Sequence, residues 1–504
     1  MPGMASALPL LLALAQTGAA SNATTQPLTD TISIASLSSG ACKDIDNCRT
    51  LADIVTSCVG TIFACVWVAV HRNLPGPMQS KTSVRLQATK VVVMTLVIPE
   101  WVMAWSVRQL LQARVYARAL ERVRRIAARE ELQRREEGTG KSLAGGLGKG
   151  RVDIRVEDIY ETQLHLPARR DLGSSAGEKA PADAEDQATS PLSPTSREDL
   201  MAPATEEEKS DAEAISWTLQ HAFFLISGGF HFYLNGQPTY PCSFDDITEL
   251  VRTCRLAAPT KEELKDKSKG DNLSKAIAIF QTLWFVAQCI ARRAQNLAIT
   301  NLEIMTLAYT VFTVAMYAAW WHKPLNIGCA IRVAGDRPRN TDRDGTSWAE
   351  LLHHWRSPAR DTLDRHKRVP TFWSSAYSHP GSRIPVQADI AALAVAMVFG
   401  AVHCAAWSYA FPTLKEKLIW RASAVVIAAI PVPIVFSFLV LNPLFGDVEQ
   451  GFMSGPVTFI YLTLAAITYV PARILLLVLT FTTLRDLPPS AFQTVQWTTL
   501  IPHY

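Results

Sequence analysis

Apolar residues lie along this chain in blocks of about 18–25, and are not scattered at the period of a strand or of an amphipathic helix. Helices of that length cross the hydrocarbon core of a bilayer. The blocks are Leu51–Val70, Val91–Leu111, Asn272–Ile290, Leu302–Trp321, Ile390–Phe411, Leu418–Leu441 and Val457–Phe481. The pattern therefore predicts an all-α, polytopic membrane helix bundle of about seven transmembrane helices, and it excludes a water-soluble globule.

Two segments leave the topology open. Val91–Leu111 carries Pro99 and Glu100 near its middle, and the weaker segment Ile215–Leu234 carries Gly228 and Gly229. Counting seven spans from a lumenal N-terminus places the Arg-rich stretch after residue 111 in the lumen, against the positive-inside rule. If Val91–Leu111 is instead re-entrant or interfacial and Ile215–Leu234 spans, this stretch returns to the cytosol. The sequence does not decide between these topologies.

Residues 112–137 predict a basic amphipathic helix. Basic residues recur at steps of three or four, as one helical stripe requires. They are Arg114, Arg118, Arg122, Arg125 and Arg129, beside an apolar stripe of Val115, Ala119, Val123 and Ile126. These five arginines are candidate contacts to the headgroups of anionic lipids. The alternative is a solvated extension of the preceding helix.

The remaining chain divides by composition. Residues 1–20 predict a signal peptide, and 21–50 a lumenal or extracellular segment in which Asn22 is a candidate glycosylation site. Residues 138–212, rich in Gly, Ser, Pro and Glu, predict a disordered linker. The other expected parts are two first helices in 51–111, a weakly apolar segment and polar connector in 213–271, a helix pair in 272–321, a hydrophilic loop in 322–389, three helices in 390–481 and a C-terminal tail in 482–504.

Charge and cysteine content set further limits. Lys and Arg number 49 against 45 Asp and Glu, so the net charge of +4 gives no overall field to attract nucleic acid. Nine cysteines are present, and four of them, Cys58, Cys65, Cys289 and Cys404, lie in apolar blocks. Those in polar context are Cys42, Cys48, Cys242 and Cys254, and they are candidate disulfide partners where they face an oxidising lumen.

No catalytic motif accompanies the apolar blocks. The sequence has no GxSxG, HExxH, Walker A or strand-flanked glycine fingerprint. His353, His354, His366 and His379 lack the repeated spacing that a metal-dependent lipid-modifying enzyme needs. We therefore expect no catalytic, cofactor-binding or metal-binding residues, and the balance favours a protein that is not an enzyme.

Charges inside the apolar blocks are the stronger functional signal, because a charge in hydrocarbon costs at least about 2.5–3.5 kcal/mol. Glu100 follows Pro99, and Arg473 lies two residues after Pro471. One hypothesis is that the two charges line a polar path or pair across the bundle; the alternative is an interfacial or purely structural role. Pro431 and Pro433 interrupt the sixth block and are further candidate intramembrane sites.

Whole blocks of the chain resemble a family of fungal multi-pass membrane proteins of unknown function. Among them are PEWVMAWSVRQLLQAR (Pro99–Arg114) and LRDLPPSAFQTVQWTTLIPHY (Leu484–Tyr504). The other similar blocks are Cys48–Pro77, Ser268–Arg293, Ile299–Val333 and Phe411–Arg421. Ala330 departs from the proline expected in such relatives. The resemblance implies a membrane bundle and no known activity.

These features favour transport, permeation or sensing of a small solute by an integral membrane protein of the secretory pathway, in the plasma membrane or an endomembrane. The first alternative is a non-catalytic scaffold that recruits protein partners through the Arg-rich helix and the linker. The second is a lipid-modifying membrane enzyme. The expected partners are the lipid bilayer, anionic lipids among them, and no nucleic acid.

Overall fold

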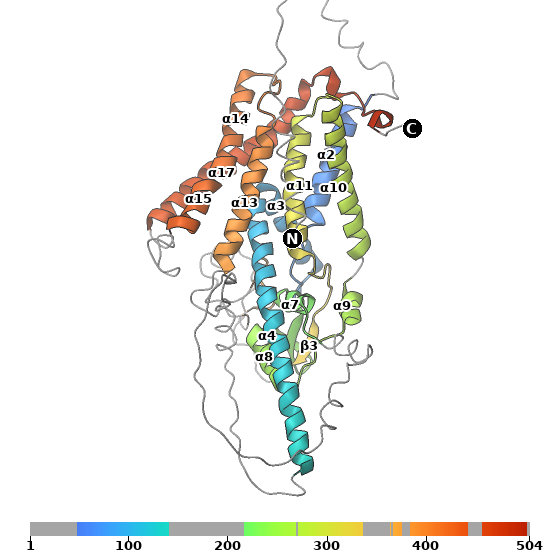
Figure 1. Ribbon diagram of the computed structural model, residues 1–504, viewed down its shortest axis with the longest axis vertical. Helices are drawn as coiled ribbons and strands as arrows, with labels where there is room; N and C mark the ends of the chain where they lie inside the picture. Colours follow the sequence, from blue (N-terminus) through green and yellow to red (C-terminus); the bar gives the residue numbers. More distant parts are fainter. Residues whose placement is uncertain are drawn as a thin grey trace, which may run out of the picture. The chain divides into compact units, whose positions relative to one another are not determined.

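The computed structural model describes residues 48–140, 216–268, 271–335, 363, 366–374, 384–441 and 456–500 (Figure 1). The chain divides into two compact units. Unit 1 comprises Met1–Val115, Ala222–Ser243 and Leu264–Tyr504, and unit 2 comprises Tyr116–His221 and Phe244–Glu263. The predicted signal peptide 1–20, Asn22, Cys42 and residues 141–212 of the linker lie outside the described residues.

Unit 1 is a helical bundle. Its long helices are α2 (Leu51–Trp67), α3 (Lys81–Val97), the first part of α4 (Pro99–Gly140), α10 (Asp271–Ala294), α11 (Asn301–Trp320), α13 (Ile384–Cys404), α14 (Leu414–Ala429) and α17 (Pro456–Thr482). Four stretches are long and apolar enough to cross a membrane: Asn301–Trp320, Ile384–Cys404, Leu414–Val440 and Ile460–Arg485. These four, or five if the bent pair of α3 and α4 counts as one, are fewer than the about seven transmembrane helices expected, among the described residues.

Helix α11 lies in the middle of the bundle, and 17 of its side chains are buried. It packs against α2 and α10 on one side and against α13 and α17 on the other (Figure 1). Capping boxes fix where α2 and α11 begin: Thr50 with Asp53, and Thr300 with Glu303, satisfy backbone donors in the first turn. The two helix starts lie next to each other, because Arg49, just before α2, contacts Glu303 in the first turn of α11 at 2.6 Å.

Small side chains allow α13 and α14 to approach closely. Ala388, Ala392, Ala396 and Gly400 recur every four residues on the buried face of α13. A Cβ atom added at Gly400 would lie 2.6 Å from the Cα atom of Ala428 on α14. This is the packing that small residues at a spacing of four give to membrane helices.

The segment Val91–Leu111 is not one helix. α3 ends at Val97 and α4 begins at Pro99, and the two helices are bent by 110° at this break. Pro99 has no backbone N–H to continue α3 and suits the first position of a new helix. Of the two interpretations of this segment, the proline-broken one agrees with the structure.

The alternative topology, in which Ile215–Leu234 spans, does not agree with the structure. Helix α7 (Leu219–Ile226) has eight residues and is followed by strand β1 (Phe230–Leu234). Gly228 adopts φ +88°, and the backbone N–H groups of Gly228 and Gly229 close the end of α7 by donating to Leu225 and Phe224. The glycine pair therefore ends the helix after two turns.

A small sheet corrects the expectation of an all-α fold. β1 pairs antiparallel with β2 (Gln237–Pro241) and parallel with β3 (Ile331–Ala334), in the order β2-β1-β3. Asn235 and Gly236, both with positive φ, make the tight turn between β1 and β2. The sheet thus joins the segment after α7 to the segment after α11.

Unit 2 contains the distal part of α4 together with α8 (Phe244–Arg252). The ring of Tyr116 stacks on that of Phe244, with centroids 3.9 Å apart. The carboxylate of Glu121 accepts a hydrogen bond from the backbone N–H of Trp217 at 3.0 Å. The apolar face of the Arg-rich helix is therefore covered by protein from its own unit.

Candidate functional site

The break between α3 and α4 sets the position of Glu100. The glutamate lies in the first turn of α4, where the free N–H groups of a helix favour a carboxylate. On the other side of the break, the carbonyl of Leu96 accepts a hydrogen bond from the hydroxyl of Tyr309 at 2.5 Å. Tyr309 lies midway along α11, so the tip of the bent pair lies inside the bundle.

Glu100 forms a buried ion pair with Arg473 of α17. Arg473 Nη1 donates to Glu100 Oε1 at 2.8 Å, and the hydroxyl of Tyr469 donates to the same oxygen at 2.5 Å. The side chains of Arg473 and Glu100 are 2% and 9% exposed. The hypothesis of a pair across the bundle thus corresponds to a contact in the structure, whereas a function for the pair stays a prediction.

Aromatic rings fix the plane of the Arg473 guanidinium. Its Cζ atom lies 3.7 Å from the ring centroid of Phe399, and at 5.6 and 5.9 Å from those of Tyr309 and Phe312. These distances allow favourable cation–π contacts. The rings therefore hold the guanidinium by its face and leave its edges for hydrogen bonds.

Three polar atoms of the buried pair have no hydrogen-bond partner among the described residues. They are Glu100 Oε2, Arg473 Nε and Arg473 Nη2. A buried polar group without a partner costs about 1–3 kcal/mol, and more when it is charged. Such atoms need a structural or functional explanation.

A second buried cluster surrounds Lys323, which follows α11. Lys323 Nζ donates to the backbone carbonyl of His71 at 2.5 Å and to Gln109 Oε1 at 2.8 Å, with Asn73 Oδ1 at 3.3 Å. The rings of Trp105 and Trp320 both lie 4.9 Å from Nζ. Among the described contacts, neutral oxygens and aromatic faces surround this ammonium in place of a carboxylate.

Burial shifts the proton affinities in the Lys323 cluster. Desolvation lowers the pKa of Lys323 well below its ordinary value. Desolvation, with smaller effects of the positive charges on Lys275 and Lys323, lowers the pKa of His71 to about 3. The Nδ1 atom of His71 lies 2.9 Å from the carbonyl of Ala69, so the neutral ring is held as an Nδ1–H donor.

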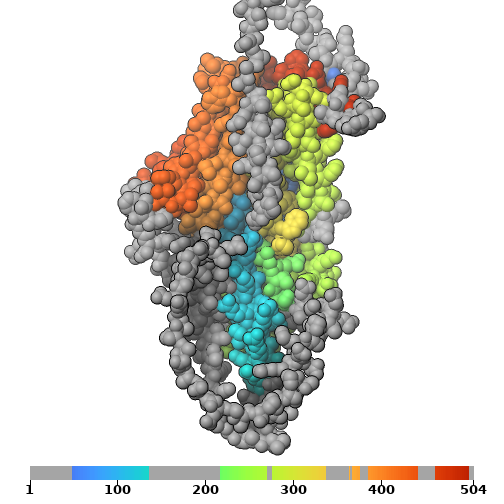
Figure 2. Space-filling view, viewed as in Figure 1, coloured from blue at the N-terminus to red at the C-terminus, as the bar shows by residue number. Residues whose placement is uncertain are grey.

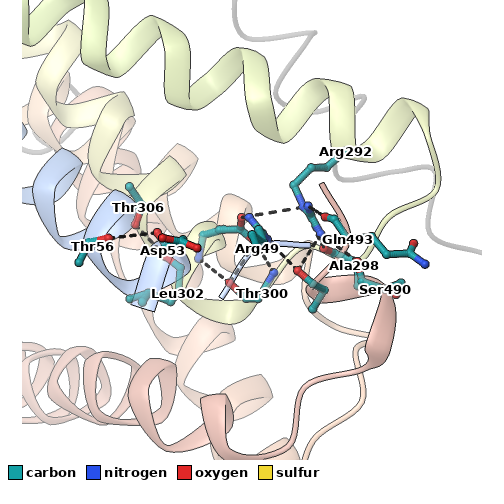
Figure 3. Close-up of polar contacts among 12 residues, drawn as sticks. Arg49, Asp53, Thr56, Arg292, Ala298, Thr300, Leu302, Thr306, Ser490 and Gln493 are labelled. Atoms are coloured by element: carbon teal, nitrogen blue, oxygen red, sulfur yellow. Dashed lines mark hydrogen bonds and ion pairs between the residues drawn. The ribbon is translucent and has the colours of Figure 1, made fainter. Parts of the chain in front are cut away.

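A third cluster lies where α2 and α11 begin and α10 ends (Figure 3). Arg49 Nη1 contacts Glu303 Oε1 at 2.6 Å. Arg292 donates to the backbone carbonyls of Ala298, Ser490 and Gln493. Because its guanidinium donates to these carbonyls, Arg292 has a structural role and connects α10 to the segment after α17.

The two prolines of the sixth block give the candidate site no support. Pro431 begins α15 (Pro431–Phe436) and is buried, while Pro433 is exposed. The carbonyl of Pro433 accepts a hydrogen bond from the Ser437 hydroxyl at 2.8 Å. Their role as intramembrane sites stays a prediction.

The Arg-rich stripe is exposed along α4. All five of its arginines have exposed side chains: Arg114, Arg118, Arg122, Arg125 and Arg129. The opposite face packs in unit 2, so it is not available to enter the headgroup region as an amphipathic membrane-surface helix would. Contacts of the arginines themselves to lipid headgroups remain a prediction.

The remaining candidates divide as follows. Cys48 is disulfide-bonded. Cys242 and Cys254 hold free thiols, so the disulfide considered between them is not formed. A physical reason is that Cys242 is buried after β2 whereas Cys254 is exposed after α8. Within the described ranges, no three His, Cys, Asp or Glu side chains group as metal ligands would.

Several residues of these clusters were missed from the sequence. Tyr469 could have been found, because it lies one helical turn before Arg473 on the same face of α17. Lys323, His71, Asn73 and Gln109 come from distant segments, and no local pattern marks them as a group. Their common signal is only that each is polar at or near the end of an apolar block.

Comparison with known proteins gives one match. No curated protein and no solved structure matches the chain. The model of a family of unknown function, DUF8562, matches residues 29–144, 195–339 and 383–504, which include α2 to α4, α10, α11, α13, α14 and α17. Since these matches cover most of the sequence, the chain belongs to this family of unknown function.

Proposed function

We propose that this protein is an integral membrane protein that binds a small polar solute at the Glu100–Arg473 pair and transports it. The observation that carries the proposal is a buried, incompletely hydrogen-bonded ion pair at the tip of a broken helix. Broken helices of this kind bring helix ends and charges to the substrate sites of transporters. The secretory pathway, at the plasma membrane or an endomembrane, remains the proposed location.

The surface of unit 1 supports insertion in a bilayer. Large apolar side chains point outward from several helices, as they do where lipid surrounds a bundle. Figure 2 shows α10 and α14 at the surface. The exposed residues are Phe63 and Trp67 of α2, Ile277, Phe280 and Leu283 of α10, Val425 of α14, and Ile460, Leu464 and Ile467 of α17. The polar side chain of Gln281 on α10 instead points inward and donates to the hydroxyl of Thr61 on α2.

The contacts at the two ends of unit 1 support six crossings and one re-entrant hairpin. We call the ends the Arg292 end (Arg49, Arg292 and Glu303) and the Lys323 end (His71, Gln109 and Lys323). α3 begins after His71, at the Lys323 end, and its last turn contacts Tyr309 in the middle of α11. α4 then runs back to the Lys323 end, where Gln109 contacts Lys323. Helices α2, α10, α11, α13, α14–α15 and α17 would then cross. With this arrangement the Arg-rich helix follows the hairpin without crossing.

Uptake by reconstituted protein tests the proposal. Purified protein in sealed liposomes is offered a panel of radiolabelled amino acids, organic acids, sugars and nucleobases. We expect uptake of at least one solute by the wild type, and a loss of at least tenfold in Glu100→Gln and in Arg473→Lys. Arg485→Lys is the matched control, because Arg485 also pairs with a glutamate, Glu416, at 2.9 Å but is 56% exposed.

The result that contradicts the proposal is uptake of no solute by correctly folded wild type, or equal uptake by all four proteins. A second candidate function is a scaffold, which the exposed arginine stripe of α4 favours. Replacing its five arginines by glutamine separates the two functions. A lost cellular phenotype with unchanged solute uptake would support the scaffold.

A further inference from the structure

We propose that the solute is an α-amino acid, whose carboxylate binds the Nε and Nη2 edge of Arg473 and whose ammonium binds Oε2 of Glu100. This assignment rests on the proposed function, because it names the substrate class of the same site. It is carried by the three buried polar atoms that have no partner among the described residues.

The chemistry of the guanidinium selects a carboxylate. Arg473 uses Nη1 for Glu100, at 2.8 Å, and for the Tyr469 hydroxyl, at 3.4 Å. Nε and Nη2 form the other edge of the planar group, with two parallel N–H donors that match the two oxygens of a carboxylate. Phe399 lies over the face of the guanidinium, and the hydroxyl of Tyr309 also interacts with the Arg473 side chain. The assignment therefore places the carboxylate at the Nε and Nη2 edge and requires that the side chains around this edge move to admit it.

Electroneutrality selects a zwitterion over a simple anion. Glu100 and Arg473 together carry no net charge, and both are almost fully buried. A bound carboxylate alone would leave one uncompensated negative charge in a low-dielectric interior, which is costly. An ammonium on the same solute restores neutrality and gives Glu100 Oε2 the donor that it lacks.

The contact between Glu100 and Arg473 limits the distance between the solute's charges. The two side chains touch at 2.8 Å, so their remaining polar atoms belong to adjacent groups. A solute that reaches both must carry its carboxylate and its ammonium close together. An α-amino acid does so, because both groups are attached to one carbon.

Direct binding to the full-length protein in lipid nanodiscs tests the assignment. The probe is an equimolar mixture of the twenty proteinogenic amino acids, followed by each amino acid alone, measured by calorimetry. For the amino acid that binds most tightly, the same molecule without its amino group and the same molecule without its carboxylate are the comparators. We expect each comparator to bind at least tenfold more weakly.

Arg473→Lys keeps the positive charge but removes the paired donors, so we expect at least tenfold weaker binding of the amino acid. Arg485→Lys is expected to bind as the wild type does. The comparator series uses the wild type alone and therefore decides the question even where a variant does not fold.

Three outcomes would overturn the assignment: no amino acid binds, a comparator binds as well as the amino acid, or folded Arg473→Lys binds as the wild type. Uptake of another class of solute in the liposome assay would then leave transport standing. Absence of all uptake would remove the proposed function as well.

Discussion

Arg473 and Lys323 are both almost fully buried, but different groups surround them. Arg473 has the carboxylate of Glu100 and the faces of three aromatic rings. Lys323 has carbonyl and amide oxygens and two tryptophan rings. Because carbonyl oxygens and ring faces carry only partial charge, Lys323 depends on the exact positions of many groups, whereas Arg473 depends mainly on one partner.

Substitutions at the central pair are expected to couple strongly. Glu100→Gln or Arg473→Met leaves a buried charge without its partner, which should cost about 3–5 kcal/mol of unfolding free energy. The double variant should cost much less than the sum of the two. Denaturant unfolding in detergent measures all four proteins. The exposed pair Glu416 and Arg485 is the control, with expected coupling of about 0–1 kcal/mol.

If the costs at Glu100 and Arg473 simply add, the contact contributes no coupling and the central pair cannot be treated as one site. Strong coupling would show energetic dependence without showing transport. For that reason the unfolding experiment and the uptake experiment answer separate questions about the same two residues.

His71 is expected to make the protein less stable in acid. Its folded-state pKa of about 3 is lower than its ordinary value of 6.5, so between these pH values the unfolded chain binds a proton that the folded protein does not. The contribution is complete above pH 6.5 and is lost as the pH falls toward 3. His71→Phe should flatten the dependence of the melting temperature on pH in this window; an unchanged slope would contradict this origin.

At the scale of elements, the length of the apolar blocks predicted most of the long helices, and Pro99 predicted the break between α3 and α4. The error at Ile215–Leu234 has a clear physical cause. Average hydropathy does not distinguish a buried helix from a buried strand, and in that segment Gly228 ends α7 before β1 begins. Asn235–Gly236 followed by Gln237–Pro241 is a local signal for a hairpin, which hydropathy averaged over the length of a span does not detect.

The same scale gives a test of helix packing. Gly400→Ala places a Cβ atom within 2.6 Å of the backbone of Ala428, so α13 and α14 must separate. Overpacking of this kind costs about 1–3 kcal/mol. Gly60→Ala on α2 is the control, because nothing lies within 4 Å of its added Cβ, and helix propensity should raise stability by about 0.5–1 kcal/mol. Thermal unfolding of both variants should therefore shift in opposite directions.

At the scale of the whole molecule, helices long and apolar enough to cross a membrane followed from the sequence, but the ion pair and the Lys323 cluster did not follow as three-dimensional sites. Glu100 and Arg473 were each identifiable as charges in apolar blocks. Their contact, and the arrangement of His71, Gln109 and Lys323, depend on segments separated by hundreds of residues. No local pattern in a single sequence shows that residues so far apart along the chain are in contact.

The topology with six crossings and a hairpin and the topology with seven crossings place the α10–α11 loop on opposite sides of the membrane. In a background without the exposed Cys254 and Cys329, we expect Asn296→Cys and Asp486→Cys to react with an impermeant maleimide from one side of sealed vesicles. Met78→Cys should react only from the other side. Labelling of positions 296 and 78 from the same side would restore the seven-span topology.

Helices α3 and α4 meet at Ile98, and the residues that contact this break from other helices are synthesised much later. Tyr309 and Arg473 follow Glu100 by more than 200 and 370 residues. Until α17 has left the ribosome, the Glu100 carboxylate lacks both Tyr469 and Arg473, and leaving it in lipid would be costly. During synthesis, this hairpin should therefore stay at the membrane surface or within the insertion machinery until α17 is complete. Completion of α17 would then allow Glu100 to enter the bilayer.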